Sequence, residues 1–171
     1  MSKKLIINII RFIILVFLQV FVLNKIHIGG YVNPYLYILF ILLFPIESPK
    51  WLQLLSAFLM GFCIDVFMQT IGINMAASVF IAWMRPGLIK SLMADKDDES
   101  NLKPGIRDFG FKGFLIYASI LTLCHHLILF YLETFKFTHF LTTLKEAVLS
   151  SLLTLFLIIL TQYLFMKPSK N

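Results

Sequence analysis

Apolar blocks long enough to cross a lipid bilayer fill most of this chain and leave short polar connections. A membrane-spanning helix needs about 20 apolar residues. A soluble domain of 171 residues could not bury a composition with 59% hydrophobic and only 14% charged residues. We therefore predict an all-α fold, a polytopic membrane bundle of about six helices that forms one domain over residues 1–171. The spans are expected near 5–23, 31–46, 51–68, 73–92, 113–132 and 146–166.

Positive charge predicts how these spans are oriented. The net charge of +6 does not indicate a nucleic-acid partner, because the basic residues flank the apolar blocks instead of forming one patch. With the N-terminus inside, the outer loops carry only Lys25, Lys136 and Lys145. This asymmetry predicts a multi-pass protein with both termini in the cytoplasm. The basic residues of the inner segments are Lys3, Lys4, Lys50, Lys90, Lys96, Lys103, Arg107, Lys112, Lys167 and Lys170.

One polar segment, residues 93–112, is long enough to stand out between two spans. Its acidic part, residues 95–101, lacks the apolar side chains that would offset the entropy of ordering. We interpret the segment as a mobile cytoplasmic connector, with a docking site as the alternative.

An aspartate inside the third span is the first candidate functional residue, because ionisable groups are costly at membrane depth. Ala57, Gly61 and Asp65 are spaced by four, so they share one helix face that another helix can approach closely. Asn74 and Ser78 form a matching stripe in the fourth span. Asp65 either supports assembly with partners or merely accepts hydrogen bonds from the N–H groups that open the fourth span. We expect Asp65→Leu and Gly61→Leu to impair assembly.

The Arg85-Pro86 pair is the second candidate. Pro86 removes one helical hydrogen bond and crowds the carbonyl of Ala82, so the fourth span should kink or end there. Arg85 could snorkel toward lipid phosphates or form an elbow for a partner, and Arg85→Ala should then weaken complex formation more than the fold. No salt bridge to Asp65 is expected, because Arg85 lies about 16 Å further inward than Asn74.

Metal, cofactor and enzyme sites are not predicted. His125 and His126 are adjacent, so on a helix they point about 100° apart and do not easily bind one metal. Cys63 and Cys124 lie in apolar blocks and are interpreted as buried free thiols. No catalytic motif occurs, so a non-enzymatic protein without a cofactor is expected.

Polar side chains gather in the outer half of the predicted bundle. This pattern suggests a polar cavity or a partner cleft near the extracytoplasmic face, provided that the side chains point away from lipid. The residues are Gln19, Asp65, Gln69, Asn74, Ser78, His125, His126, Glu146, Ser150 and Ser151.

Several short motifs follow one another along the first half of the chain. Each is weak alone, and their order and spacing carry the information. The motifs are Asn33-Pro34-Tyr35, Gly61-x-x-x-Asp65, Gly72 and Arg85-Pro86.

In these motifs, and over nearly its whole length, the chain resembles the MreD family of bacterial rod-shape-determining membrane proteins. The resemblance implies a non-enzymatic scaffold of the cell-elongation machinery in the bacterial inner membrane, which helps to couple cytoskeletal filaments to peptidoglycan synthesis. It implies an MreC-like protein, an MreB-like filament, a RodA-like glycosyltransferase and a penicillin-binding transpeptidase as partners. It also implies the helical fold of the substrate-binding subunits of energy-coupling-factor transporters. The residues carried over as partner-binding or structural are Asn33, Pro34, Gly61, Asp65, Gly72, Arg85 and Pro86.

A second function class stays open. The chain could be a small-molecule uptake subunit of a membrane transporter, with the outer polar layer as its pocket. A scaffold would copurify with MreC-like partners, whereas an uptake subunit would bring a ligand or an ATPase module.

Overall fold

The described part of the protein is a bundle of helices. The computed structural model describes residues 3–26, 32–70, 72–92, 104–134 and 140–165, and these contain helices and no strand. The predicted all-helical fold is therefore confirmed for this part of the chain. The helices are α1 (Lys3–Phe21), the 3-10 turn η1 (Leu23–Lys25), α2 (Ile38–Leu42), α3 (Lys50–Met68), α4 (Ile73–Leu92), α5 (Ile106–Thr134) and α6 (Phe140–Phe165).

Four of the described helical segments are long and apolar enough to cross a membrane, which is fewer than the six spans expected. They are Leu5–Lys25, Lys50–Met68, Ile106–Thr134 and Phe140–Phe165. The helix α4 has 20 residues, but it contains Arg85 and several small or polar side chains and is less apolar than these four. The expected span near 31–46 differs more strongly from the structure, because α2 is the only α-helix within it.

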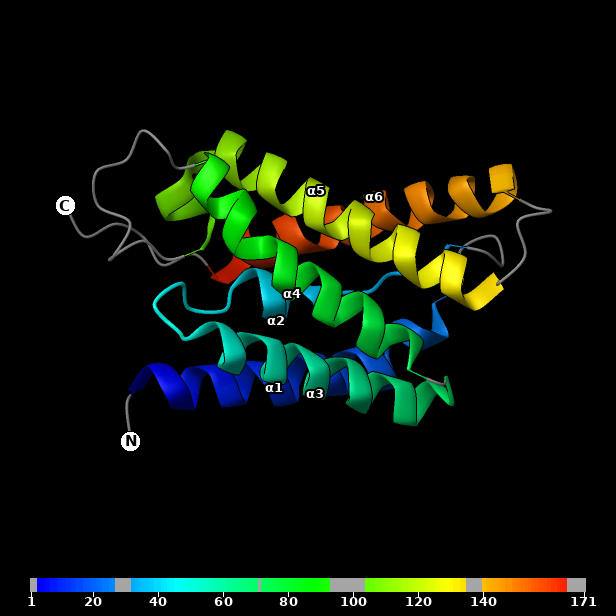
Figure 1. The fold of residues 1–171 in the computed structure, drawn as a ribbon, viewed down its shortest axis with the longest axis horizontal. Coiled ribbons are helices and arrows are strands. Elements are labelled where there is room, and N and C mark those ends of the chain that lie inside the picture. Colours follow the sequence, from blue (N-terminus) through cyan, green and yellow to red (C-terminus); the bar gives the residue numbers. More distant parts are fainter. Residues whose placement is uncertain (1–2, 27–31, 71, 93–103, 135–139, 166–171) are drawn as a thin grey trace.

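The segment that includes α2 is the centre of the bundle. Figure 1 shows α2 between the α1 and α3 helices on one side and α5 and α6 on the other. Every residue from Tyr35 to Leu42 is at most 5% exposed. The residues before α2 stay irregular, and Pro34 accounts for part of this because it cannot donate a backbone hydrogen bond. Irregular backbone is tolerated at membrane depth only where protein surrounds it.

Side chains from α1 and α6 hold this irregular segment in place. Gln19 donates from its Nε2 to the carbonyl of Pro34 at 2.9 Å, and its Oε1 accepts from the backbone N–H of Tyr37 at 3.4 Å. Thr154 Oγ1 accepts from the backbone N–H of Tyr35 at 3.0 Å. These bonds replace the ladder that a regular helix would supply, so the polar side chains of two outer helices define the path of the central segment.

The last two long helices begin earlier than the hydropathy pattern predicts. The helix α5 begins at Ile106, inside the predicted loop 93–112, and contains a break at Gly110 with φ 71° and ψ 162°. Glycine reaches this positive φ without the steric cost of a side chain. The helix α6 begins at Phe140 instead of near residue 146. The acidic residues 95–101, expected to be the most mobile, lie outside the described residues.

Two residues with positive φ lie between the end of α3 and the start of α4. Gln69 ends α3 in the left-handed region with φ 57°, and Gly72 follows with φ 75°. The start of α1 and the end of α6 lie at the same end of the bundle in Figure 1, together with the end of α4 and the start of α5.

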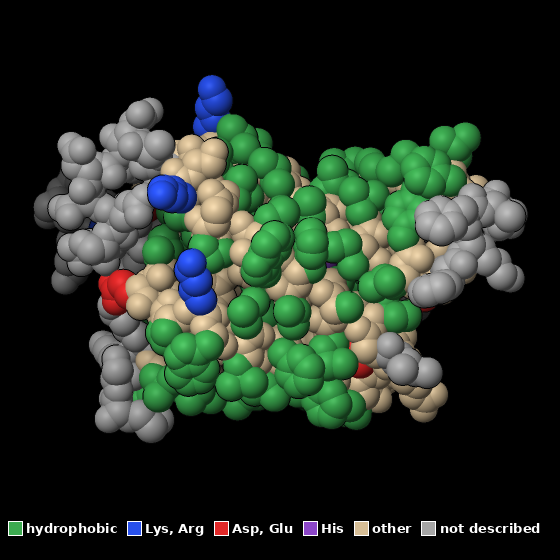
Figure 2. Space-filling model, in the orientation of Figure 1, with side chains coloured by type: hydrophobic (Ala, Val, Ile, Leu, Met, Phe, Trp, Pro, Cys, Tyr) green, Lys and Arg blue, Asp and Glu red, His purple; other side chains and the backbone are tan. Residues whose placement is uncertain are grey.

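The flank of the bundle is apolar. Figure 2 shows hydrophobic side chains spread over the visible face, with the Lys and Arg side chains gathered toward its left end. Large side chains point outward from several helices, as Phe17, Trp83 and Phe156 are 59%, 68% and 62% exposed. An outward-facing apolar surface of this extent is compatible with lipid as the surrounding solvent.

Candidate functional site

Asp65 lies at the junction of α3 and α4 and is 4% exposed. Its carboxylate accepts from the backbone N–H groups of Asn74 and Met75 at 3.1 and 2.9 Å. It also accepts from Asn74 Nδ2 at 3.0 Å and from the Thr70 hydroxyl. The N–H groups in the first turn of α4 have no partner within the helix, and a carboxylate there also stabilises the helix dipole. The geometry thus matches the second interpretation of Asp65, in which it caps the fourth predicted span.

Gly61 lets α3 and α4 touch through their backbones. A Cβ atom at Gly61 would lie 2.5 Å from Met75 Cα and 2.7 Å from the carbonyl oxygen of Asn74. Real Cβ atoms essentially never come this close to backbone atoms. The predicted small-residue face is therefore present, and its neighbour is α4 of the same chain.

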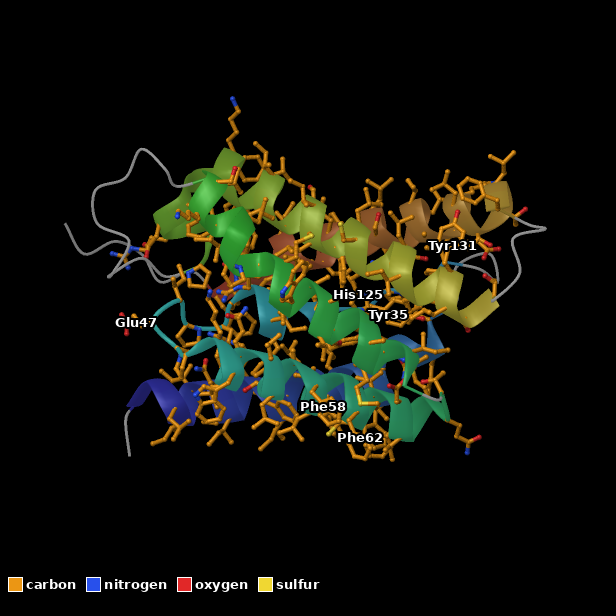
Figure 3. All side chains as sticks on the ribbon, in the orientation of Figure 1. Tyr35, Glu47, Phe58, Phe62, His125 and Tyr131 are labelled. Carbon is orange, nitrogen blue, oxygen red and sulfur yellow. The ribbon has the colours of Figure 1, made fainter. Side chains whose placement is uncertain are left out.

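A hydrogen-bonded chain runs from the Asp65 cap into the centre of the bundle. Tyr37 donates its hydroxyl proton to Asn74 Oδ1 at 3.0 Å, because the Nδ2 of Asn74 is already directed at Asp65 and Thr70. His125 Nε2 lies 2.7 Å from the same Tyr37 hydroxyl. The Tyr37 hydroxyl donates its one proton to Asn74, so it can only accept from His125. We therefore assign the Nε2–H tautomer to His125. Figure 3 shows His125 and Tyr35 in the interior of the bundle.

His126 points toward α6 instead. Its Nδ1 lies 2.8 Å from the carbonyl of Thr122, which can only accept, so Nδ1 carries the proton. Its Nε2 then accepts from Thr154 Oγ1 at 3.2 Å. The two adjacent histidines therefore have different partners, and the described residues contain no group of three or more His, Cys, Asp or Glu that could hold a metal ion.

Four buried polar atoms have no hydrogen-bond partner among the described residues: Asn33 Oδ1, Ser78 Oγ, Thr122 Oγ1 and His125 Nδ1. Such atoms are rare in native proteins and call for an explanation. Most of the predicted outer polar layer is nevertheless turned into the protein and away from lipid. Gln19, Asp65, Asn74, Ser78, His125, His126, Ser150 and Ser151 are buried, whereas Glu146 is half-buried and Gln69 is exposed.

Arg85 is also inside the bundle, at 1% exposure. Its Nε donates to the Tyr117 hydroxyl at 2.7 Å, and its Nη2 donates to the backbone carbonyls of Leu42, at 3.4 Å, and Phe44. Tyr117 in turn donates to the Leu42 carbonyl at 2.9 Å. Because α2 ends at Leu42, the guanidinium lies at a helix C-terminus, where carbonyls lack partners and a cation is stabilised.

The predicted snorkelling of Arg85 is therefore wrong. The carbonyls at the end of α2 solvate the guanidinium inside the protein, so it does not need to reach lipid phosphates. A partner could not touch it without moving α2 or α5. Among the described residues no ion pair joins Arg85 to Asp65, as the depth estimate predicted. A second arginine reaches the same end of α2, since Arg11 Nη1 donates to the carbonyl of Leu43 at 3.1 Å.

Pro86 lies within α4 and does not end it, because the helix continues to Leu92. Proline leaves the carbonyl four residues earlier, that of Ala82, without its helical donor. Gln53 Nε2 supplies a donor to that carbonyl at 3.0 Å, and Gln53 is 5% exposed. Gln53 was not among the residues predicted from the sequence, although it precedes Ala57 by four residues and so continues the stripe through Gly61 and Asp65.

The pairing of Gln53 with the proline-freed carbonyl predicts a coupled pair of substitutions. Gln53→Leu should lower the free energy of unfolding by about 1–2 kcal/mol, because the Ala82 carbonyl is then buried without a partner. In a Pro86→Ala background the restored N–H bonds that carbonyl, so the same change should cost much less. Thermal unfolding of the four proteins in detergent measures the coupling. Equal losses in both backgrounds would contradict the assignment.

Most motif residues fall at two places in the bundle. Arg85 binds the carbonyls at the end of α2, whereas Gly61, Asp65 and Gly72 lie at the contact and turn between α3 and α4. Asn33 is tied to α6, as its backbone N–H donates to Ser150 Oγ at 3.1 Å. Tyr37 and Tyr117, which bond the two places to the central segment, carried no sequence signal beyond their aromatic character. Comparison of the chain with protein-family models, curated proteins and solved structures finds no match.

Proposed function

We propose that this protein is a non-enzymatic membrane scaffold of the bacterial cell-elongation machinery, which helps to couple cytoskeletal filaments to peptidoglycan synthesis. The observation that carries the proposal is how the buried aspartate and the buried arginine of the described bundle are used. Asp65 caps α4, and Arg85 binds the carbonyls that end α2. Both charges stabilise contacts within the chain, which suits a rigid subunit that presents its outer surface to partners. The identity of the partners rests on the resemblance to MreD.

The arrangement of the termini supports the proposed topology. The two ends of the described chain lie at the same end of the bundle, which requires an even number of crossings. The four spans of sufficient length and hydropathy become six when α4 and the segment that contains α2 are counted as crossings. The basic residues of the inner segments favour the cytoplasm for that end. We therefore propose six crossings in the cytoplasmic membrane, with the second made partly of irregular backbone.

The outward face of α1 is the proposed contact surface for partner helices. Only 11% of the most apolar stretch of this span is buried inside the protein. The corresponding shares for the other three spans of sufficient length and hydropathy are 22%, 33% and 44%. Ile10, Ile13 and Phe17 are all more than half exposed. A helix with so few contacts to its own bundle is available to pack against another protein in the bilayer.

Site-specific photo-crosslinking in a rod-shaped bacterium tests this function. A crosslinker at Ile13 or Phe17 should capture an MreC-like or RodA-like protein, and the same probe at Phe156 on α6 should capture less. Recovery of none of the four implied partners, by crosslinking or by copurification, would contradict the scaffold.

One observation favours the alternative of small-molecule uptake. Thr122 Oγ1 and His125 Nδ1 are two of the four buried polar atoms that have no partner in the described part of the chain, and a polar ligand could supply one. Native mass spectrometry of the purified protein separates the two functions. A stoichiometric small ligand, or a copurifying ATPase module, would support the uptake function and contradict the scaffold function.

A further inference from the structure

An open apolar groove lies on the flank of the bundle, between α4 and α5. It has a volume of about 380 Å³ and is lined by Trp83, Met84, Gly87, Leu88 and Ile120. This volume is within the range of about 300–1,000 Å³ that is usual for ligand pockets. The space beside Gly87 is open, since a Cβ atom at that position would meet nothing within 4 Å.

The helices that form the groove each carry an exposed lysine between the groove and one end of the bundle. Lys90 lies one turn after Gly87 on α4, and it is exposed. Lys112 is exposed on α5, about two turns before Ile120 and after the break at Gly110. The end of α4 and the start of α5 lie at the same end of the bundle (Figure 1), and basic side chains gather at that end (Figure 2).

We propose that this groove is a binding site for an anionic phospholipid, with an acyl chain along Gly87 and the headgroup phosphate between Lys90 and Lys112. An apolar channel that leads to two ammonium groups matches a molecule with an apolar tail and an anionic head. A free phosphate would leave the channel unfilled. A second copy of the chain, packed about a two-fold axis on this groove, would bring like lysines together and be repelled.

Trp83 provides a direct readout, because the chain has two tryptophans and the other, Trp51, lies at the start of α3. In a Trp51→Phe protein, all tryptophan fluorescence comes from the groove. The protein is placed in phosphatidylcholine nanodiscs that contain a minor fraction of brominated phosphatidylglycerol or, for comparison, brominated phosphatidylcholine. At equal mole fraction the anionic lipid should quench Trp83 more, with a preference of about fivefold for each lysine.

Matched variants distinguish a specific lipid site in the groove from a general attraction of anionic lipid to the positively charged protein. Lys90→Glu and Lys112→Glu should each reduce the preference and together abolish it, whereas Lys50→Glu, at the start of α3, should leave it unchanged. Gly87→Leu should reduce quenching by both lipids because it fills the groove, and Ala76→Leu, on an exposed part of the same helix, should not. Native mass spectrometry of each variant provides a second count of retained phosphatidylglycerol.

Several outcomes would overturn the proposal. An equal preference at Trp51, measured in the Trp83→Phe protein, would mean that charge attracts the lipid without a groove. An effect of Lys50→Glu as large as that of Lys90→Glu would mean the same. If neither brominated lipid quenches Trp83, protein covers the groove, and a second copy becomes its occupant.

Discussion

Replacing Gly61 with leucine should separate α3 from α4 and strongly destabilise the fold. The first added atom would already lie 2.5 Å from Met75 Cα, which belongs to the backbone and cannot rotate away. The Asp65 cap depends on the same close approach, because its acceptors reach Asn74 and Met75 across this contact. We expect a loss of about 3 kcal/mol or more, which corresponds to a fall of about 10 °C in Tm.

Thermal unfolding of the detergent-solubilised protein measures this loss, and two variants serve as controls. Gly61→Ala should also be destabilised, because the clash begins at Cβ. Gly87→Leu makes the same glycine-to-leucine change on a neighbouring helix, where a Cβ meets nothing within 4 Å, and should leave Tm nearly unchanged. An unchanged Tm for Gly61→Leu with loss of partner copurification would show that this face serves assembly instead of the hairpin.

The α3–α4 hairpin could be predicted from the sequence because its determinants are local and periodic. The spacing by four of Ala57, Gly61 and Asp65 defines one face of a helix, and the turn through Gly72 brings the next helix onto that face. The same periodicity, continued to Gln53, could have identified the donor that compensates Pro86.

The central segment could not be predicted in the same way. Hydropathy identifies residues 31–46 as apolar, and apolarity does not distinguish a span that faces lipid from an irregular segment buried by other helices. The path of the segment is defined by Gln19 and Thr154, which bond its backbone from distant parts of the chain. Backbone carbonyls and N–H groups have no sequence signature, so a fold that depends on them is underdetermined by side-chain patterns.

The position of Arg85 could not be predicted for the same reason, because its partners are backbone carbonyls. An arginine near the inner end of an apolar block ordinarily extends toward water. Here the end of α2 provides several carbonyl oxygens, and these exist only because α2 stops after five residues. The start of α5 was misplaced for a related reason, since Arg107, Asp108 and Lys112 lower the local hydropathy although the backbone there is helical.

Replacing Arg85 with methionine should destabilise the fold itself. Each hydrogen bond from the guanidinium to Tyr117, Leu42 or Phe44 involves a charged donor and is worth about 1.5–3 kcal/mol. Removing a buried cation also relieves a desolvation cost, which offsets part of that loss. We expect a net loss of about 3 kcal/mol, measured as a lower Tm. Tyr117→Phe should be less affected, because the guanidinium keeps its contacts with the carbonyls of Leu42 and Phe44.

The comparison with Arg85→Lys tests whether the stabilisation by Arg85 depends on the geometry of the guanidinium or on its charge alone. A lysine ammonium keeps the charge at the end of α2, but as a single point it cannot bond Tyr117 and the Phe44 carbonyl together as a planar guanidinium does. Arg85→Lys should therefore recover less than half of the loss, while Lys90→Met, which removes an exposed cation from the same helix, should change stability by no more than about 0.5 kcal/mol. Full recovery by lysine would mean that the charge alone matters. A stable Arg85→Met protein that no longer copurifies with partners would mean that Arg85 serves the complex, so that α2 must move to expose it when the complex forms.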